Sequence, residues 1–294
     1  MTTLKLLRDK YHTRVCEEII RISVSRGGVE YPNFADVGSK NSIAIALGIV
    51  KQLVYSTNYD ILKGQTAGGK FEEATKDFLE ETFTLLHPIR PGNWFYSTKM
   101  PISRFDQYEH LAALDLMVRN NPTLASVLGG DYVIKPDIVV ARWPVGDDQI
   151  NCADVKIVDN EHKTAKLTPL RRSNYPEDWM LLHASISCKW TIRSDRSQNS
   201  RTEALNLIRN RKGGVPKIVA VTGEPLPMRI SSLALGTGDL DCVYHFALYE
   251  LEASIKELLE KGFPGIDDQA EELRNLIIGR RLRDISDLPF DLAI

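Results

Sequence analysis

Three charged side chains lie in or beside segments that are otherwise apolar. Asp137 falls within "YVIKPDIVV", Lys189 ends the alternating segment "LLHASISCK", and Glu203 follows after 13 intervening residues. A carboxylate in so apolar a segment needs a partner or a metal ion, because an unpaired buried charge is costly. Mg²⁺ prefers carboxylate oxygens as ligands and can activate water at a phosphodiester, beside which a lysine stabilises charge. Together the three residues predict phosphodiester hydrolysis.

Each residue also has an ordinary structural interpretation. A lysine at the end of a strand is usually solvated, and an isolated aspartate is often held by backbone hydrogen bonds. Glu203 and Glu72 both fall near the start of an expected helix, where the helix dipole favours an acid. The surroundings of these residues therefore have to decide between a structural and a catalytic role.

The segment from residue 189 to 217 is strongly basic. It holds eight Lys or Arg against two acids, a net charge of +6, so the other residues carry −8 in a chain whose net charge is −2. A basic surface on an otherwise acidic protein suits a nucleic-acid partner. Within it, "RSDR" (193–196) offers arginine donors for guanine and a carboxylate acceptor for cytosine, although the same motif also forms surface salt bridges.

The chain has the composition of a globular protein. It has 294 residues, of which 43% are hydrophobic and 26% charged, enough for one large core or two small ones. The four cysteines form no C-x-x-C pair, no segment has the roughly 20 apolar residues of a membrane span, and the N-terminus lacks the apolar stretch of a signal peptide. These features predict a reduced, cytoplasmic protein without a membrane segment.

The periodicity of apolar residues predicts the elements that must position the charged groups. Helical patterns cover 3–26, 41–56, 70–86, 104–128, 200–211, 248–262 and 267–279, with "GQTAGG" as a flexible turn before the third. Short apolar or alternating segments at 131–143, 181–190, 217–223 and 241–249 predict strands, and 143–180 is the least regular stretch. The mixed order predicts an α/β fold with a central sheet and helices packed on it.

The spacing of the charged residues resembles that of type II restriction endonucleases that cut sites with a CCGG core. Pro136 and Asp137, then 51 residues, then Lys189, then 13 residues, then Glu203 match that arrangement, with Ser187 in the position that is usually acidic. Longer segments are also similar to this family: "LLHASISCKWTIRSDR", "ALNLIRNRKG", "RISSLALGTGDLDCVYHFALYELE" and "RLRDISDLPFDLA". The resemblance runs from about residue 34 and is weakest in 141–178.

The resemblance implies a fold and a division of the chain. It implies a PD-(D/E)XK restriction-endonuclease-like α/β core, with a mixed central sheet flanked by helices. Residues 1–294 would form a single domain, with a mainly helical part at 1–130, the catalytic sheet core at 131–250 and a C-terminal helical part at 251–294.

The resemblance also implies the catalytic roles. Asp137 would bind both of two Mg²⁺ ions, with the backbone carbonyl of Cys188 as a further ligand, and Glu203 and Glu72 would complete the acidic shell. Lys189 would act near the scissile phosphate, and Ser187 would fill the vacated acidic position.

DNA recognition is implied in the same way. Arg193, Asp195 and Arg196 match the residues that contact the CCGG core, and Gln65 matches a residue near the minor groove. Asp36 and Arg229 match residues that contact the outer base pair, giving GCCGGC, although Gly38 replaces a serine in that part of the family pattern.

The resemblance further implies partners. Both strands of a six-base-pair palindrome would be cut to leave 5′ overhangs, and a palindrome requires at least a homodimer. Relatives form homotetramers, and a companion DNA methyltransferase belongs to the same restriction-modification system.

Two alternatives remain open at this point. Asp154-Val155-Lys156 begins after 16 residues that follow Asp137 and fits the usual PD…DxK spacing better than Lys189 does, but it lacks nearby arginines. Lys189 is preferred because it lies in the basic segment. The other alternative is a sequence-specific DNA-binding protein that does not cleave, for which the acids beside apolar segments would serve no purpose.

Overall fold

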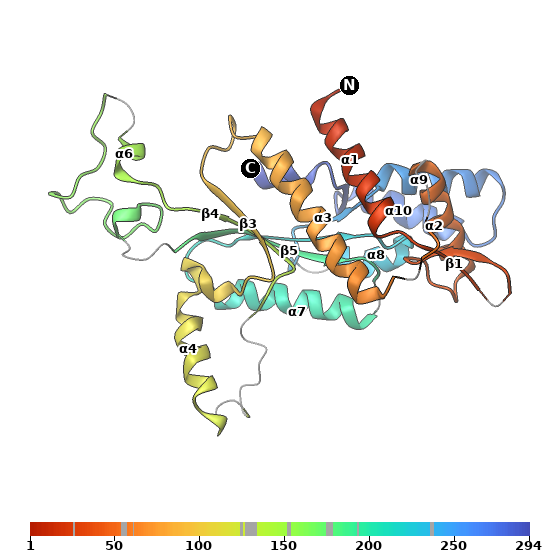
Figure 1. Cartoon of the computed structure of the whole chain (residues 1–294), viewed down its shortest axis with the longest axis horizontal. Helices are drawn as coiled ribbons and strands as arrows, with labels where there is room; N and C mark the ends of the chain where they lie inside the picture. Colours follow the sequence, from red (N-terminus) through yellow and green to blue (C-terminus); the bar gives the residue numbers. More distant parts are fainter. Residues whose placement is uncertain are drawn as a thin grey trace.

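A six-stranded mixed sheet forms the centre of the protein (Figure 1). This computed structural model describes residues 1–25, 27–53, 58–60, 62–123, 126, 134–151, 154–174, 179–192, 194–235 and 238–294, without the side chains of residues 115, 119 and 194–198. The strand order is β3-β4-β5-β6-β7-β8, antiparallel from β3 to β5 and parallel from β5 to β8. The strands are β3 (Trp94–Thr98), β4 (Ile138–Arg142), β5 (Leu181–Lys189), β6 (Lys217–Thr222), β7 (Cys242–His245) and β8 (Leu282–Asp284). The predicted α/β class with a mixed central sheet is confirmed.

Strands β4 and β5 occupy the interior of this sheet. Residues 138–141 of β4 are fully buried, as expected of a strand whose two faces are both covered, and this explains the continuous apolar run there. β5 pairs antiparallel with β4, which sets Ile138 opposite Ile186, and parallel with β6, which sets Ser187 opposite Ala220. The start of β4 therefore lies beside the end of β5.

Helices cover both faces of the sheet. In Figure 1, α1 and α3 lie on one side of it and α7 on the other, while α2, α9 and α10 gather at one end. The helices are α1 (Thr3–Glu18), α2 (Lys40–Leu53), α3 (Gly64–Leu85), α4 (Glu109–Arg119), α6 (Asp147–Ile150), α7 (Ser194–Asn210), α8 (Pro227–Ala234), α9 (Leu248–Glu260), α10 (Asp267–Ile278) and α11 (Leu288–Ala293), with 3-10 turns η1 (Ile102–Arg104), η2 (Asp106–Tyr108) and η3 (Arg172–Asn174). The helices predicted at 41–56, 248–262 and 267–279 are confirmed to within a few residues.

Two predictions about the N-terminal half were wrong. The first helix ends at Glu18 rather than at 26, because the chain turns into a hairpin of β1 (Ile22–Val24) and β2 (Glu30–Pro32). The segment "GQTAGG" is not a flexible turn but the first part of α3. Ala67 within it is buried, and this packing offsets the low helix propensity of the glycines.

The sheet extends beyond the part of the chain expected to hold it. Its edge strands β3 and β8 come from the parts predicted to be mainly helical, 1–130 and 251–294. β3 is half-buried along its whole length and β8 has three residues, so neither shows a clear strand pattern. One hydrophobic core includes residues from Tyr11 to Leu292 and draws on all three parts.

The irregular stretch after β4 projects away from the sheet (Figure 1). It contains α6 and η3, and its shape is maintained by Arg171, whose guanidinium is almost fully buried and donates two hydrogen bonds of 2.6 Å to Asp147. Predicted as the least regular part of the chain, this stretch contains no strand among its described residues.

None of the described helices is both long and apolar enough to cross a membrane. Cys16, Cys188 and Cys242 are buried and free of disulfides, and Cys152 lies outside the described residues.

Candidate active site

The centre of the site is a hydrogen-bonded pair formed by Asp137 and Lys189. Asp137 directly precedes β4, and the antiparallel pairing places it beside the last residues of β5. Its Oδ2 accepts a hydrogen bond of 2.9 Å from Lys189 Nζ and one of 2.8 Å from the backbone N–H of Cys188. Both side chains keep about a fifth of their surface exposed, 24% for Asp137 and 19% for Lys189. The pair is therefore held by the sheet and still accessible from solvent.

Lys189 is held in its charged form. Burial by itself would lower the pKa of its ammonium group, but the charge and hydrogen bond of Asp137, with the charge of Glu203, outweigh burial and raise that pKa. A fixed positive charge that is largely shielded from water interacts strongly with an anion brought next to it. This arrangement suits stabilisation of a phosphate.

Glu72 approaches the Asp137–Lys189 pair from the face of the sheet that α3 covers. It lies in the third turn of α3, and burial together with the charge of Asp137 raises the pKa of its carboxyl. Its Oε2 is buried and has no hydrogen-bond partner among the described residues, although Lys99 Nζ lies 3.6 Å away. Lys99 follows β3, and its backbone N–H donates to the carbonyl oxygen of Asp137 at 3.3 Å.

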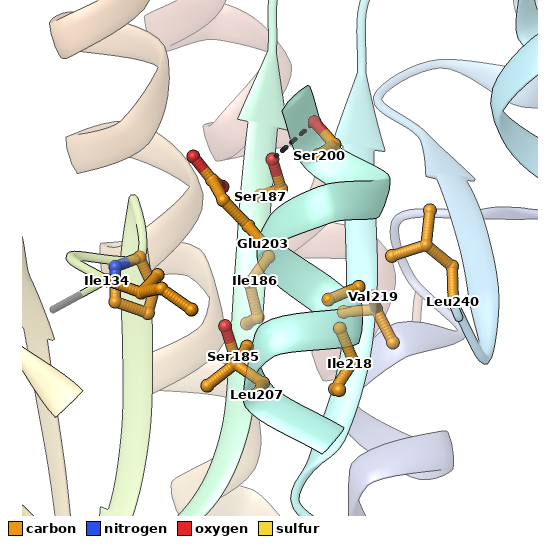
Figure 2. A pocket seen from close by; sticks show the side chains of 12 residues that line it. Ile134, Ser185, Ile186, Ser187, Ser200, Glu203, Leu207, Ile218, Val219 and Leu240 are labelled. Atoms are coloured by element: carbon orange, nitrogen blue, oxygen red, sulfur yellow. Dashed lines mark hydrogen bonds between the residues drawn. The ribbon is translucent and has the colours of Figure 1, made fainter. Parts of the chain in front are cut away.

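Glu203 and Ser187 approach from the face covered by α7 (Figure 2). Both line a small cavity between β5 and α7, together with Pro136 and Ser200. Ser187 Oγ lies 3.2 Å from Ser200 Oγ, so the serine in the usually acidic position has a hydroxyl partner. Burial is the main reason that the pKa of the Glu203 carboxyl is raised, and the nearby charge of Lys189 opposes the shift.

Cys188 offers a backbone oxygen rather than a thiolate. Burial raises the pKa of its thiol well above the ordinary value, with the charge of Asp137 acting in the same direction. The thiol therefore stays protonated at neutral pH, and only the carbonyl group of this residue is suited to a hard cation.

The donors present fit a hard divalent ion. Asp137, Glu203 and Glu72 supply carboxylates, and the buried Oε2 of Glu72 has no hydrogen-bond partner among the described residues, where such an atom normally has one. The three carboxylates do not form a group with ligand atoms within 4.8 Å of one another; among the described residues only Asp159, Glu161 and His162 do. That second group lies in the irregular stretch, where Asp159 already bonds His162.

The alternative lysine lies elsewhere. Asp154 and Lys156 are exposed and outside any strand, and Lys156 Nζ pairs with Asp159 at 3.3 Å. The structure brings Lys189 to Asp137, and Lys156 to a different acid.

The residues proposed for the CCGG core are only partly described. Asp195 and Arg196 fall in the first turn of α7, which begins five positions after the last residue of β5, but their side chains lie outside the described residues. Arg193 lies wholly outside them. Because the basic segment begins at Lys189, it leaves the sheet at the end of β5 that carries the catalytic candidates.

The two residues proposed for the outer base pair contact each other. Asp36, in the loop between β2 and α2, forms a salt bridge with Arg229 on α8, and each side chain keeps more than a third of its surface exposed. Gln65 is exposed in the first turn of α3. Residues that are 193 positions apart in sequence are thus neighbours at the surface.

The sequence analysis missed two charged residues at the site, Lys99 and Glu224. Lys99 follows a strand that was not predicted, so no pattern indicated it. Glu224 is 1% exposed, and burial raises the pKa of its carboxyl to about 7. An acid directly after the apolar segment "KIVAVTG" is a signal that could have identified Glu224.

Comparison with known proteins gives two sequence matches. The family model described as NgoMIV restriction enzyme matches residues 11–294. The type II restriction enzyme NgoMIV of Neisseria gonorrhoeae is 45% identical over 292 residues, which cover 98% of this chain and 97% of that protein.

Two solved structures are similar at much lower identity. A restriction endonuclease PspGI complex with substrate DNA is 13% identical with a TM-score of 0.31, covering 99% of this chain and 92% of that one. The type IIF restriction endonuclease Bse634I with cognate DNA is 12% identical with a TM-score of 0.35, covering 86% and 99%. At such scores these structures add nothing to the two sequence matches.

Proposed function

Because the chain belongs to the NgoMIV restriction enzyme family, we propose that this type II restriction endonuclease cuts both strands of a six-base-pair palindrome with a CCGG core. GCCGGC is the proposed site, with 5′ CCGG overhangs and a requirement for Mg²⁺. The observation that carries the proposal is the contact between Lys189 and Asp137, with the acids Glu72 and Glu203 beside it. Family membership favours cleavage over the alternative of a DNA-binding protein that does not cut.

We assign Asp137, Glu203, Glu72 and the carbonyl of Cys188 to metal binding. When bound, Mg²⁺ supplies positive charge at the phosphate and lowers the pKa of water, and two ions are proposed for each site. Lys189 holds a fixed ammonium charge beside the scissile phosphate. Ser187, paired with Ser200, keeps the usually acidic position uncharged, which leaves Glu203 on α7 as the acid on that face.

We assign DNA recognition to residues that follow β5 and to residues of α3, α8 and the loop before α2. Arg193, Asp195 and Arg196 would contact the CCGG core, Asp36 and Arg229 the outer base pair, and Gln65 the minor groove. Support comes from the net positive charge of 189–217 and from the Asp36–Arg229 salt bridge, whose members together offer an acceptor and donors to a base pair.

A palindromic site also implies the assembly. A homodimer places one active site on each strand, and we propose a homodimer or a homotetramer. The protein would act in the cytoplasm beside a methyltransferase that protects the same sequence in host DNA.

Digestion of a plasmid with mapped CCGG-containing sites tests this function. We expect discrete fragments with Mg²⁺ and intact plasmid with EDTA, because the proposed hydrolysis requires the ion that the acidic residues would bind. Sequencing of the cut ends gives the outer base pair and the overhang. Intact plasmid under both conditions, with retardation in a gel, would instead show a protein that binds without cutting.

Replacement of either core-contacting arginine tests the recognition residues. Arg193→Ala or Arg196→Ala should reduce discrimination between CCGG and substituted cores by about 1–3 kcal/mol, because each loses a two-pronged contact with guanine. Binding to cognate and random duplexes is compared for each variant. An equal loss on both kinds of DNA would identify these residues as phosphate contacts.

A further inference from the structure

The chain between the catalytic lysine and the DNA-contacting residues is held by the segment that follows β6. The carbonyl oxygen of Lys189 accepts hydrogen bonds from Thr222 Oγ1 at 2.8 Å and from the backbone N–H of Gly223 at 3.2 Å. The backbone N–H of Ile192 donates to Glu224 Oε2 at 2.9 Å. Three consecutive residues thus fix the path of 189–192, directly before Arg193.

The middle residue of this segment packs against an aromatic cluster. A Cβ atom at Gly223 would lie 2.6 Å from Trp190, so only glycine allows this approach. Trp190 is buried, and its ring centroid lies 5.2 Å from that of Phe34 and 4.9 Å from that of Phe71. The path of 189–192 is therefore packed as well as hydrogen-bonded.

Glu224 also contacts Arg229, one of the two residues proposed for the outer base pair. Its Oε1 accepts from the backbone N–H of Leu226 at 3.3 Å, at the start of α8, and lies 3.9 Å from Arg229 Nη1 on that helix. Arg229 in turn pairs with Asp36. One carboxylate therefore joins the backbone that leads to Arg193 with the helix that carries Arg229.

The burial of Glu224 makes this position unusual. The side chain is 1% exposed, and burial raises the pKa of its carboxyl, with Asp36 acting in the same direction and Arg229 and the two N–H donors opposing. A buried acid of this kind costs free energy unless its contacts compensate. In the described structure, those contacts are with Ile192, close before the residues proposed for the CCGG core, and with Leu226 and Arg229, at and in the helix proposed for the outer base pair.

We propose that Glu224 is a positioning residue that fixes the backbone of 189–192, which leads to the residues proposed for the CCGG core, and the Asp36–Arg229 pair relative to each other. Recognition of the inner and outer base pairs then depends on one buried carboxylate that does not itself touch DNA. This inference rests on the proposed function, because it assumes the recognition roles of Asp36, Arg229 and residues 193–196.

The test is the substitution Glu224→Gln, which keeps the size of the side chain and an acceptor for Ile192 but removes the charge facing Arg229. Single-turnover cleavage with Mg²⁺ is measured at a pH well above the Glu224 pKa of about 7, where its carboxylate is charged, and at increasing enzyme concentration on duplexes containing GCCGGC, ACCGGT and GCATGC. We expect kcat/KM on GCCGGC to fall roughly tenfold to a hundredfold, the effect of losing a charged hydrogen-bond partner. The preference for GCCGGC over each substituted duplex should fall as well.

Glu250→Gln is the matched control. Glu250 on α9 accepts two hydrogen bonds from Arg8, at 2.8 and 2.7 Å, so this substitution also removes the charge of a well-shielded glutamate. It should lower the melting temperature without changing either preference. If Glu224→Gln behaves in the same way, Glu224 is only structural and the inference is wrong.

Arg229→Ala separates failure of the inference from failure of the proposed recognition roles. If it changes the preference at the outer base pair while Glu224→Gln changes neither preference, the recognition role stands and the inference fails. If Arg229→Ala leaves the outer preference unchanged, the proposed role of Arg229 fails. A change in only one preference in Glu224→Gln would overturn the link between the two sets.

Discussion

Lys189→Ala is expected to reduce cleavage by about a hundredfold to a thousandfold, the usual effect of removing a preorganised charge at a developing anion. The lysine is charged, largely shielded and placed 2.9 Å from Asp137. DNA binding should persist, because the basic segment that follows keeps its other cations. Cleavage of a plasmid and retardation of a cognate duplex measure the two properties.

Lys156→Ala is the matched control for this substitution. It removes the lysine of the alternative DxK motif, whose side chain is 66% exposed and pairs with Asp159. We expect cleavage close to that of the wild type. An inactive Lys156→Ala with an active Lys189→Ala would mean that the active site has been assigned to the wrong lysine.

Asp137→Asn is expected to reduce cleavage at least as much as Lys189→Ala does, on the order of a thousandfold or more. The substitution removes the charge of the proposed shared metal ligand, and a metal ion contributes several kcal/mol to stabilisation of transition-state charge, at about 1.4 kcal/mol for each tenfold change. The asparagine oxygen can still accept from the N–H of Cys188, so the end of β5 should keep its structure. Cleavage rate, melting temperature and calorimetric Mg²⁺ binding are measured together.

The specific result is loss of Mg²⁺ binding together with loss of cleavage. Asp154→Asn, the equivalent change in the alternative motif, should leave both unchanged because Asp154 is exposed and outside the sheet. Full Mg²⁺ binding by inactive Asp137→Asn would show that Asp137 acts through Lys189 rather than through the metal.

Much of the fold follows from local patterns in the sequence. The continuous apolar run of β4 indicates that both faces of the strand are buried, and the alternation of β5 indicates that one face is buried. The 3.6-residue period of α2, α9 and α10 indicates one buried stripe along each helix. These elements are found where the patterns place them. The long irregular stretch after β4 is also visible in the sequence, because it lacks both periods.

The missed elements depend on packing that no local pattern contains. β3 and β8 are recognisable as strands only through their neighbours in the sheet, and the glycine-rich start of α3 is helical because Ala67 packs into the core. The hairpin after Glu18 is likewise set by pairing with residues 30–32. In each case tertiary contacts outweigh local propensity.

The chemical types at the site can be read from the sequence: an aspartate and a lysine beside apolar segments, acids within helical segments, and a basic segment after the lysine. Which of these residues contact one another depends on the tertiary structure. It sets Asp137 beside Lys189 rather than Lys156, adds Lys99 and places buried Glu224 between Ile192 and Arg229. Side-chain chemistry and local periodicity are properties of a segment. Which segments lie side by side depends on the strand order and register that bury the core as a whole.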